Sequence, residues 1–228
     1  MKALVTLILV GISLVCNAQT HQLGLGGGIN TLLSWNDEPP FGEGSPFDSK
    51  IGHTTNLTYT FVFKNGITIS LQNSLVTLNY LSDNAIAFRD ENNEPVRADR
   101  KLSLQNYQAS LGGGYVFNFG DRYTMNVHAG LDFLFYFNQV AYSKGYPETK
   151  IERKQDWEED NRFYGVFLGM RQNYDIYKSQ NLDLFLTCSL RATQIFDYIN
   201  LSGGENRLLP ELTLGIGVSF GKFRGSRF

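Results

Sequence analysis

Three polar residues, His128, Asp132 and Arg191, carry side chains of the types that perform acid–base chemistry. His128 and Asp132 lie four residues apart in a segment where polar and apolar residues alternate. On an extended strand this spacing puts both on one face but about 13 Å apart, too far for direct proton transfer. We therefore interpret them as part of a structural polar network, whose predicted members are His128, Asp132, Arg171, Asp183, Arg191 and Glu211.

Other motifs lack the context that their chemistry needs. The glycine runs at residues 26–28 and 112–114 resemble phosphate-binding loops, but each lies in a strand pattern with no helix after it. Asp156, Glu158, Glu159 and Asp160 could bind a divalent cation, yet they match no defined calcium-loop spacing. No His/Cys cluster has zinc spacing. We predict no catalytic residue, no cofactor and no metal site.

Composition indicates an all-β chain. Of 228 residues, 14% are aromatic and 23 are Gly, while only 18% are charged. The net charge of −2 leaves no basic surplus to neutralise phosphates, which argues against a nucleic-acid partner. The mean hydropathy of −0.22 excludes a bundle of transmembrane helices.

Residues 1–18 are predicted to be a cleaved signal peptide, followed by one domain over residues 19–228. Lys2 precedes an apolar run, and Cys16-Asn17-Ala18 fits the small-x-small pattern before a cut. The alternatives are a membrane anchor, for which about 14 apolar residues are too few, and a lipoprotein cut before Cys16. Val15 disfavours that cut, because a small residue is expected there. Cleavage would leave Cys188 as the one cysteine, so no intrachain disulfide could form.

Alternation with a period of two predicts eight β-strands. It is cleanest in residues 123–137, where odd positions are apolar and even positions mostly polar or small. The alternation changes parity near residues 73–76 and 105–106, which we interpret as bulges or as strand ends leaving a membrane.

The predicted connections alternate strictly between short and long. Three are short, at residues 64–66, 120–122 and about 175–181, and four are long and polar, at about 36–50, 82–100, 142–162 and 197–209. Short turns at one end and long loops at the other are typical of outer-membrane barrels. Most strands offer at least about 9 alternating residues, enough to cross a bilayer when tilted. Because lipid tolerates no open sheet edge, we expect a closed eight-stranded antiparallel up-and-down transmembrane β-barrel.

The alternative is a soluble lipocalin-like barrel, whose apolar face would line a ligand cavity. The membrane reading is favoured because the polar face carries charged residues, each of which would cost up to about 2–4 kcal/mol on lipid. Aromatic residues near strand ends fit the girdles at membrane interfaces. These predicted interface residues are Trp35, Phe63, Phe119, Tyr123, Phe137, Tyr164 and Phe220.

With its Asn17-Ala18-Gln19 ending of the signal, eight amphipathic strands, four long loops and terminal Phe228, the chain resembles small outer-membrane β-barrel proteins, OmpA/OmpX-like or PorT-like barrels of Bacteroidota. The resemblance implies an outer-membrane location, contact with its lipid, and the barrel-assembly machinery as a partner that reads Phe228. Some such barrels are enzymes that modify lipid A. The His-x-Ser pattern of the deacylases among them is absent here, so a lipid A-modifying enzyme is kept only as the alternative.

We therefore expect a non-enzymatic barrel without an open pore, acting through its outer loops in a structural or interaction role. Exposed aromatic residues in long loops are candidate contacts for an unknown extracellular or envelope partner. The candidates are Phe41, Phe47 and Trp157.

Overall fold

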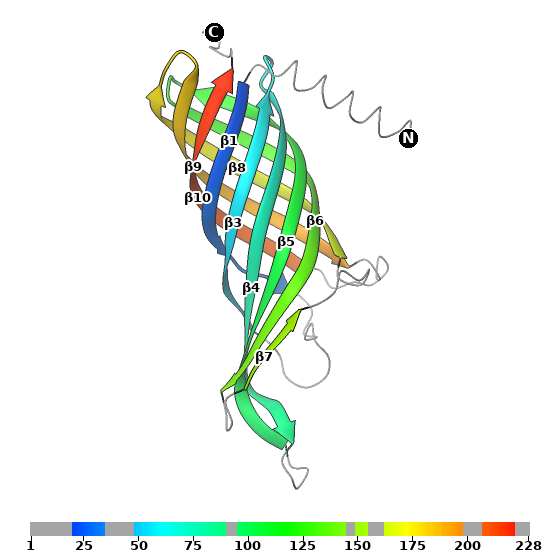
Figure 1. Ribbon diagram of the computed structural model, residues 1–228. Helices are drawn as coiled ribbons and strands as arrows, with labels where there is room; N and C mark the ends of the chain where they lie inside the picture. Colours follow the sequence, from blue (N-terminus) through cyan, green and yellow to red (C-terminus); the bar gives the residue numbers. More distant parts are fainter. Residues whose placement is uncertain are drawn as a thin grey trace.

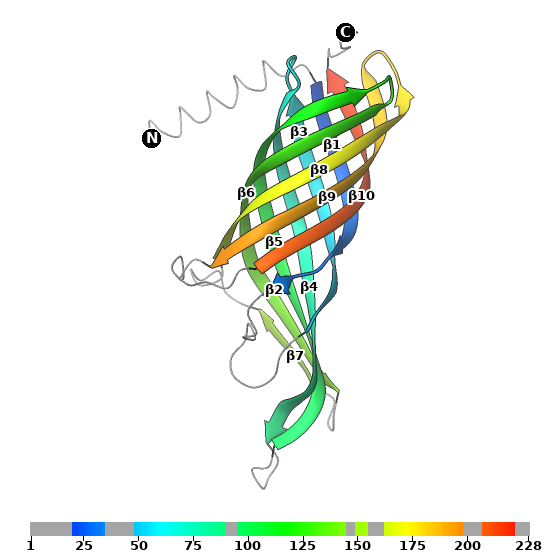
Figure 2. The same ribbon diagram turned by 180° about the vertical axis from the view of Figure 1, so that it is seen from behind.

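Most of the described chain is one closed antiparallel sheet. A computed structural model describes residues 20–34, 48–89, 95–144, 149–154, 162–197 and 207–221. Within these ranges the strands are β1 (Thr20–Asn30), β2 (Leu33–Ser34), β3 (Asp48–Val62), β4 (Ile67–Arg89), β5 (Pro95–Phe119), β6 (Tyr123–Lys144), β7 (Thr149–Lys154), β8 (Arg162–Lys178), β9 (Leu182–Asp197) and β10 (Arg207–Gly221). Eight of them pair in chain order, and β1 pairs with β10 to close the barrel (Figures 1 and 2). The predicted eight-stranded barrel is confirmed.

Tight turns join the strands at one end of the barrel, where β1 begins and β10 ends (Figure 1). Between β3 and β4, Gly66 has φ of 83° and its N–H donates to Phe63 O at 3.0 Å. The backbone N–H of Ile67 donates to the Asn65 side chain at 3.2 Å. A positive φ suits Gly because it has no Cβ, so Asn-Gly specifies this turn.

The alternation of residues sorts polar side chains inward and apolar side chains outward. On β3, Thr54, Thr58 and Thr60 are buried, whereas Leu57 between them is 47% exposed. Ile216 on β10 is 63% exposed, whereas Asp132, which points into the barrel from β6, is 1% exposed. The lumen therefore holds the polar face. This arrangement contradicts the lipocalin-like alternative, which needs the apolar face inside.

At the loop end this sorting reverses. Apolar side chains fill the lumen in a layer that we call the plug: Leu32, Val76, Leu78, Tyr80, Leu102, Leu104, Leu134, Ile195 and Leu209. On the outside at this level, the Ser103 hydroxyl donates to Asn79 at 2.7 Å and Asn138 donates to Gln105 at 3.0 Å. An apolar inside and a polar outside are what a barrel needs in water, so the plug marks where the wall leaves the apolar zone.

The reversal explains one of the two changes of parity in the sequence. Around residues 73–76 the pairing of β4 with both neighbours continues without a shift, so no bulge lies there. Instead the inward set changes from polar Ser74 to apolar Val76 and Leu78. The second change, at residues 105–106, is a bulge: Gln105 pairs with Asn138 and Asn106 with Tyr136, which leaves Phe137 unpaired in this register.

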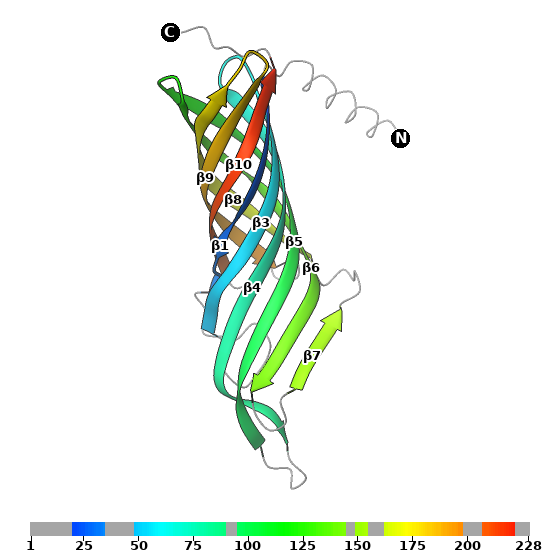
Figure 3. The ribbon, with the colours of Figure 1, turned by 60° about the vertical axis from the view of Figure 1, so that its left-hand side comes forward.

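Two of the four predicted long loops are wrong in extent. β4 runs to Arg89 and β5 starts at Pro95, so residues 82–100 are mostly a paired hairpin rather than a loop. Within residues 142–162, β7 pairs with the end of β6. Together β4–β7 form a curved sheet that continues beyond the barrel (Figure 3). The prediction failed because apolar alternation disappears once strands leave lipid, although backbone pairing persists.

Candidate functional site in the barrel lumen

The centre of the lumen holds a hydrogen-bonded group around Asp132 on β6. This carboxylate accepts hydrogen bonds from Gln108 Nε2 at 2.9 Å and Thr193 Oγ1 at 2.8 Å. It also forms a salt bridge with Arg191 on β9, two strands away in the barrel wall. Asp132 is 1% and Arg191 4% exposed. Burial without partners would be costly for either charge. The salt bridge and its hydrogen bonds therefore hold β6 and β9 together across the lumen.

Arg191 contacts four further groups. Its Nε donates to Thr193 Oγ1 at 3.3 Å. Its Nη2 donates to Ser110 Oγ at 3.0 Å, and its guanidinium carbon lies 3.9 Å from the centroid of the Phe167 ring. Its Nε is 3.7 Å from Glu211 Oε2. The guanidinium therefore lies between two carboxylates and over an aromatic face, which is favourable for a desolvated cation.

Glu211 extends this network to the opposite side of the barrel. Its Oε1 accepts a hydrogen bond from Thr54 Oγ1 at 2.9 Å, and Thr54 Oγ1 accepts one from Asn30 Nδ2 at 2.7 Å. The chain of contacts thus runs from β6 through β9 and β10 to β3 and β1. Cross-lumen bonding of this kind rigidifies a wall that has no apolar core at this level.

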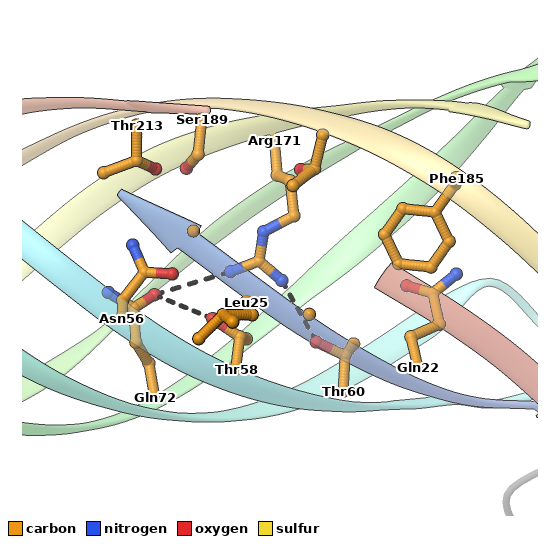
Figure 4. A pocket seen from close by; sticks show the side chains of 13 residues that line it. Gln22, Leu25, Asn56, Thr58, Thr60, Gln72, Arg171, Phe185, Ser189 and Thr213 are labelled. Carbon is orange, nitrogen blue, oxygen red and sulfur yellow. Dashed lines mark hydrogen bonds between the residues drawn. The ribbon is translucent and has the colours of Figure 1, made fainter. Parts of the chain in front are cut away.

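Arg171 on β8 belongs to a separate group. It donates from Nη1 to Thr60 Oγ1 at 3.2 Å and from Nη2 to Gln72 Oε1 at 3.5 Å (Figure 4). Thr60 in turn shares a hydrogen bond with Ser70 at 2.9 Å. Arg171 has no salt bridge within the described residues.

His128 stands apart from Asp132. Its ring packs edge-on against Phe167, with centroids 5.7 Å apart, and it lies against Gly169, where a Cβ would be only 2.8 Å from His128 Nε2. Among the residues that the structure describes, His128 Nδ1 has no hydrogen-bond partner. In the described residues no Ser or Thr hydroxyl hydrogen-bonds to a histidine, so His128 has no nucleophile to activate there.

Asp183 was expected in the network, but the structure does not place it there. It lies at the turn end of β9, where its Oδ1 accepts a hydrogen bond from the backbone N–H of Ser179 at 3.2 Å. The pattern of alternation gave the correct inward parity but not the level along the barrel. Asp183 closes the β8–β9 turn, while Asp132, Arg191 and Glu211 meet near the centre.

The outer surface carries an apolar band around the barrel. On β5 the outward residues from Phe119 to Tyr107 are aromatic, aliphatic or Gly, and the next outward residues are Gln105 and Ser103. About 12 residues at about 3.3 Å each, tilted by about 45°, give a band about 28 Å tall, close to the apolar band of outer-membrane barrels. The chain is a transmembrane β-barrel.

Aromatic residues lie at both edges of the transmembrane barrel's apolar band. Of the predicted interface residues, Phe119, Tyr164 and Phe220 are 52%, 39% and 38% exposed, Tyr123 and Phe63 are half-buried near the turns, and Phe137 is the unpaired bulge residue. The set of interface residues predicted from the sequence missed His21, Tyr59 and Phe61, which pack together with Phe220 near the β1–β10 closure. It also missed the exposed Tyr174, Tyr177 and Phe196. The same alternation would have identified most of them.

Several predicted residues lie outside the described part of the chain: Trp35, Phe41, Phe47, Trp157 and Phe228, together with the signal peptide of residues 1–18. Their roles remain predictions. The described ranges bring together no group of three or more His, Cys, Asp or Glu placed to hold a metal ion. Among the same residues no helix is long and apolar enough to cross a membrane.

Solved structures with a similar fold include three bacterial surface proteins. Ail, the attachment invasion locus protein of Yersinia pestis, is 12% identical with a TM-score of 0.45, covering 89% of this chain and 99% of its own. Neisserial surface protein A is 13% identical with a TM-score of 0.47, over 89% and 97%. The outer membrane protein OprG from Pseudomonas aeruginosa is 11% identical with a TM-score of 0.47, over 90% and 97%.

No protein-family model matches the chain, and no curated protein matches it. The likeness to the three structures is one of fold. The fold of this barrel is established by its own strand pairing and its own outer surface.

Proposed function

We propose that the protein is a sealed outer-membrane barrel that holds an interaction surface outside the cell. The observation that supports a sealed barrel is the plug, in which Leu209, Val76 and Leu134 are 0%, 1% and 2% exposed. Eight strands leave an interior just wide enough for side chains to fill. A layer of packed apolar side chains across such an interior would block water and ions.

Conductance tests the seal. The purified barrel in a planar lipid bilayer should give no stable ion current under an applied voltage. A variant with Val76, Leu134 and Leu209 all changed to Ala removes the centre of the plug and should conduct more than the parent barrel. A steady, voltage-independent current through the unmodified barrel would contradict the proposal.

The proposed interaction surface is the sheet that β4–β7 form beyond the barrel (Figure 3). With short turns on the periplasmic side, as in outer-membrane barrels, this sheet faces outward. The β3–β4 pairing ends at Asp48 and Leu81, so β4 continues for eight residues without β3 beside it. Among the described residues β7 pairs with β6 alone. Sheet edges with unpaired backbone groups can accept a strand from a partner.

Site-specific photo-crosslinking in the native cells tests this role. A crosslinker at position 86 lies on the projecting part of β4, and one at Leu168 lies on the apolar band, where the side chain is 64% exposed. We expect a discrete protein adduct from position 86 and only lipid adducts from Leu168. Equal patterns from both positions would refute an interaction surface on the sheet.

The partners predicted from the sequence remain proposals, and they are consistent with this function. The apolar band would contact outer-membrane lipid, the barrel-assembly machinery would read Phe228 during insertion, and Phe41, Phe47 and Trp157 remain candidate loop contacts for an extracellular or envelope partner. No described side chains have the geometry that would favour the alternative of a lipid A-modifying enzyme.

A further inference from the structure

A polar chamber lies in the lumen around Arg171, separate from the group around Asp132. It is lined by side chains of β1, β3, β4, β8, β9 and β10, among them Asn56, Thr60, Gln72 and Thr187. Arg171 is 8% exposed and its guanidinium points among these groups (Figure 4).

The charges of the lumen are unevenly distributed. Arg191 lies beside two carboxylates, those of Asp132 and Glu211. Arg171 has no carboxylate within 4.0 Å among the described residues, and its hydrogen-bond acceptors, Thr60 and Gln72, are neutral. Hydrogen bonds to neutral groups solvate a guanidinium but do not balance its charge, so this buried cation lacks a counter-ion within the described chain.

The chamber also offers hydrogen-bond donors that have no acceptor. A guanidinium has five N–H donors, and Arg171 uses two of them for Thr60 and Gln72 among the described residues. Within the described ranges, the buried Thr187 Oγ1 has no hydrogen-bond partner. Ser189 and Thr213 add hydroxyls to the same lining. Several donors around one unbalanced positive charge are the chemistry that binds an anion.

The size of the chamber limits the guest. The space inside it is small and holds a guest the size of about one or two water molecules. Gly24 lines it, and a Cβ added at Gly24 would have only Ile216 O within 4 Å, at 3.9 Å. Phosphate and sulfate with their hydrogen-bonding shells need more space than this.

We propose that this chamber is a binding site for a small monovalent anion of the halide class, which Arg171 holds by charge and N–H donation. Thr187, Ser189 and Thr213 supply hydroxyl donors around it. The bound ion balances the buried guanidinium and stabilises the folded barrel.

Bromide is the probe. The barrel in detergent is unfolded with urea in sodium bromide or in sodium isethionate, whose organic anion is too large for the chamber, at equal ionic strength. If bromide binds the folded state alone, a concentration ten times its Kd raises the folding equilibrium constant about 11-fold. We expect that increase in bromide and none in isethionate. Anomalous diffraction from bromide-soaked crystals should show one peak beside Arg171.

Variants separate this site from general salt effects. Arg171→Met should lose the response to bromide, whereas Lys178→Met, which removes an exposed cation of the same strand, should keep it. If Arg171→Met does not fold, Gly24→Val fills the chamber while keeping Arg171 and should also lose the response. Identical unfolding of the parent barrel in both salts, or a response that survives both Arg171→Met and Gly24→Val, would overturn the proposal in favour of a chamber holding water alone.

Discussion

Replacing Asp132 by Ala tests whether the lumenal network holds the barrel together. The change removes the salt bridge to Arg191 and the acceptor for Gln108 and Thr193. It leaves Arg191 buried, with Glu211 Oε2 at 3.7 Å as its remaining carboxylate. Loss of one partner from a buried pair typically lowers the free energy of unfolding by about 3–5 kcal/mol, and we expect Asp132→Ala to fall in that range.

The matched control is Asp183→Ala, which removes a carboxylate of the same type from the turn end. Asp183 accepts a hydrogen bond from the backbone N–H of Ser179 and is only partly buried, so we expect a loss of about 0.5–1.5 kcal/mol. Urea titration in lipid vesicles, followed by gel mobility without boiling, measures both. The double variant Asp132→Ala with Arg191→Met should be more stable than the sum of the single losses by about 1–3 kcal/mol. If Asp132→Ala costs no more than Asp183→Ala, or if the double variant shows no coupling, the network does not stabilise the barrel.

Three further perturbations probe the wall and the plug by the same urea assay. Ile216→Arg places a charge on the apolar band and should lower the free energy of unfolding by about 2–4 kcal/mol. Asn79→Arg, on the polar outer surface beyond the band, should lower it little. Equal losses would refute the position of the band. Gly114→Ala would drive a Cβ against Val127 O and the His128 side chain, at a cost of about 1–3 kcal/mol in stability. Its neighbour Gly113 should tolerate Ala, because the nearest atom to an added Cβ would be Thr68 O at 3.8 Å. The reverse order of losses would contradict the inward position of Gly114 and the outward position of Gly113. Leu209→Ala, at a side chain that is 0% exposed, should cost about 2–5 kcal/mol, and a loss below that range would indicate that the plug is loosely packed.

The glycine run 112–114 illustrates what sequence alone could give and what it could not. The sequence excluded a phosphate loop, because no helix follows the run. Alternation placed Gly112 and Gly114 on the polar face, but it did not show what each glycine packs against, since that depends on neighbours across the sheet. The fold packs Gly112 against the Phe167 ring and Gly114 against β6, while Gly113 faces outward with space around it.

The sequence by itself predicted the number of barrel strands, the polar and apolar faces of each strand, and the Asn65-Gly66 turn. Each of these follows from local rules: the two-residue period of a strand and the preference of Gly for positive φ. Only the tertiary structure decided at which level each inward residue lies, because strand tilt and register set that level. Register brings Asp132 and Arg191 together from positions 59 residues apart and keeps Asp183 at the turn. It also leaves Arg171 with no carboxylate within 4.0 Å in the described part of the chain.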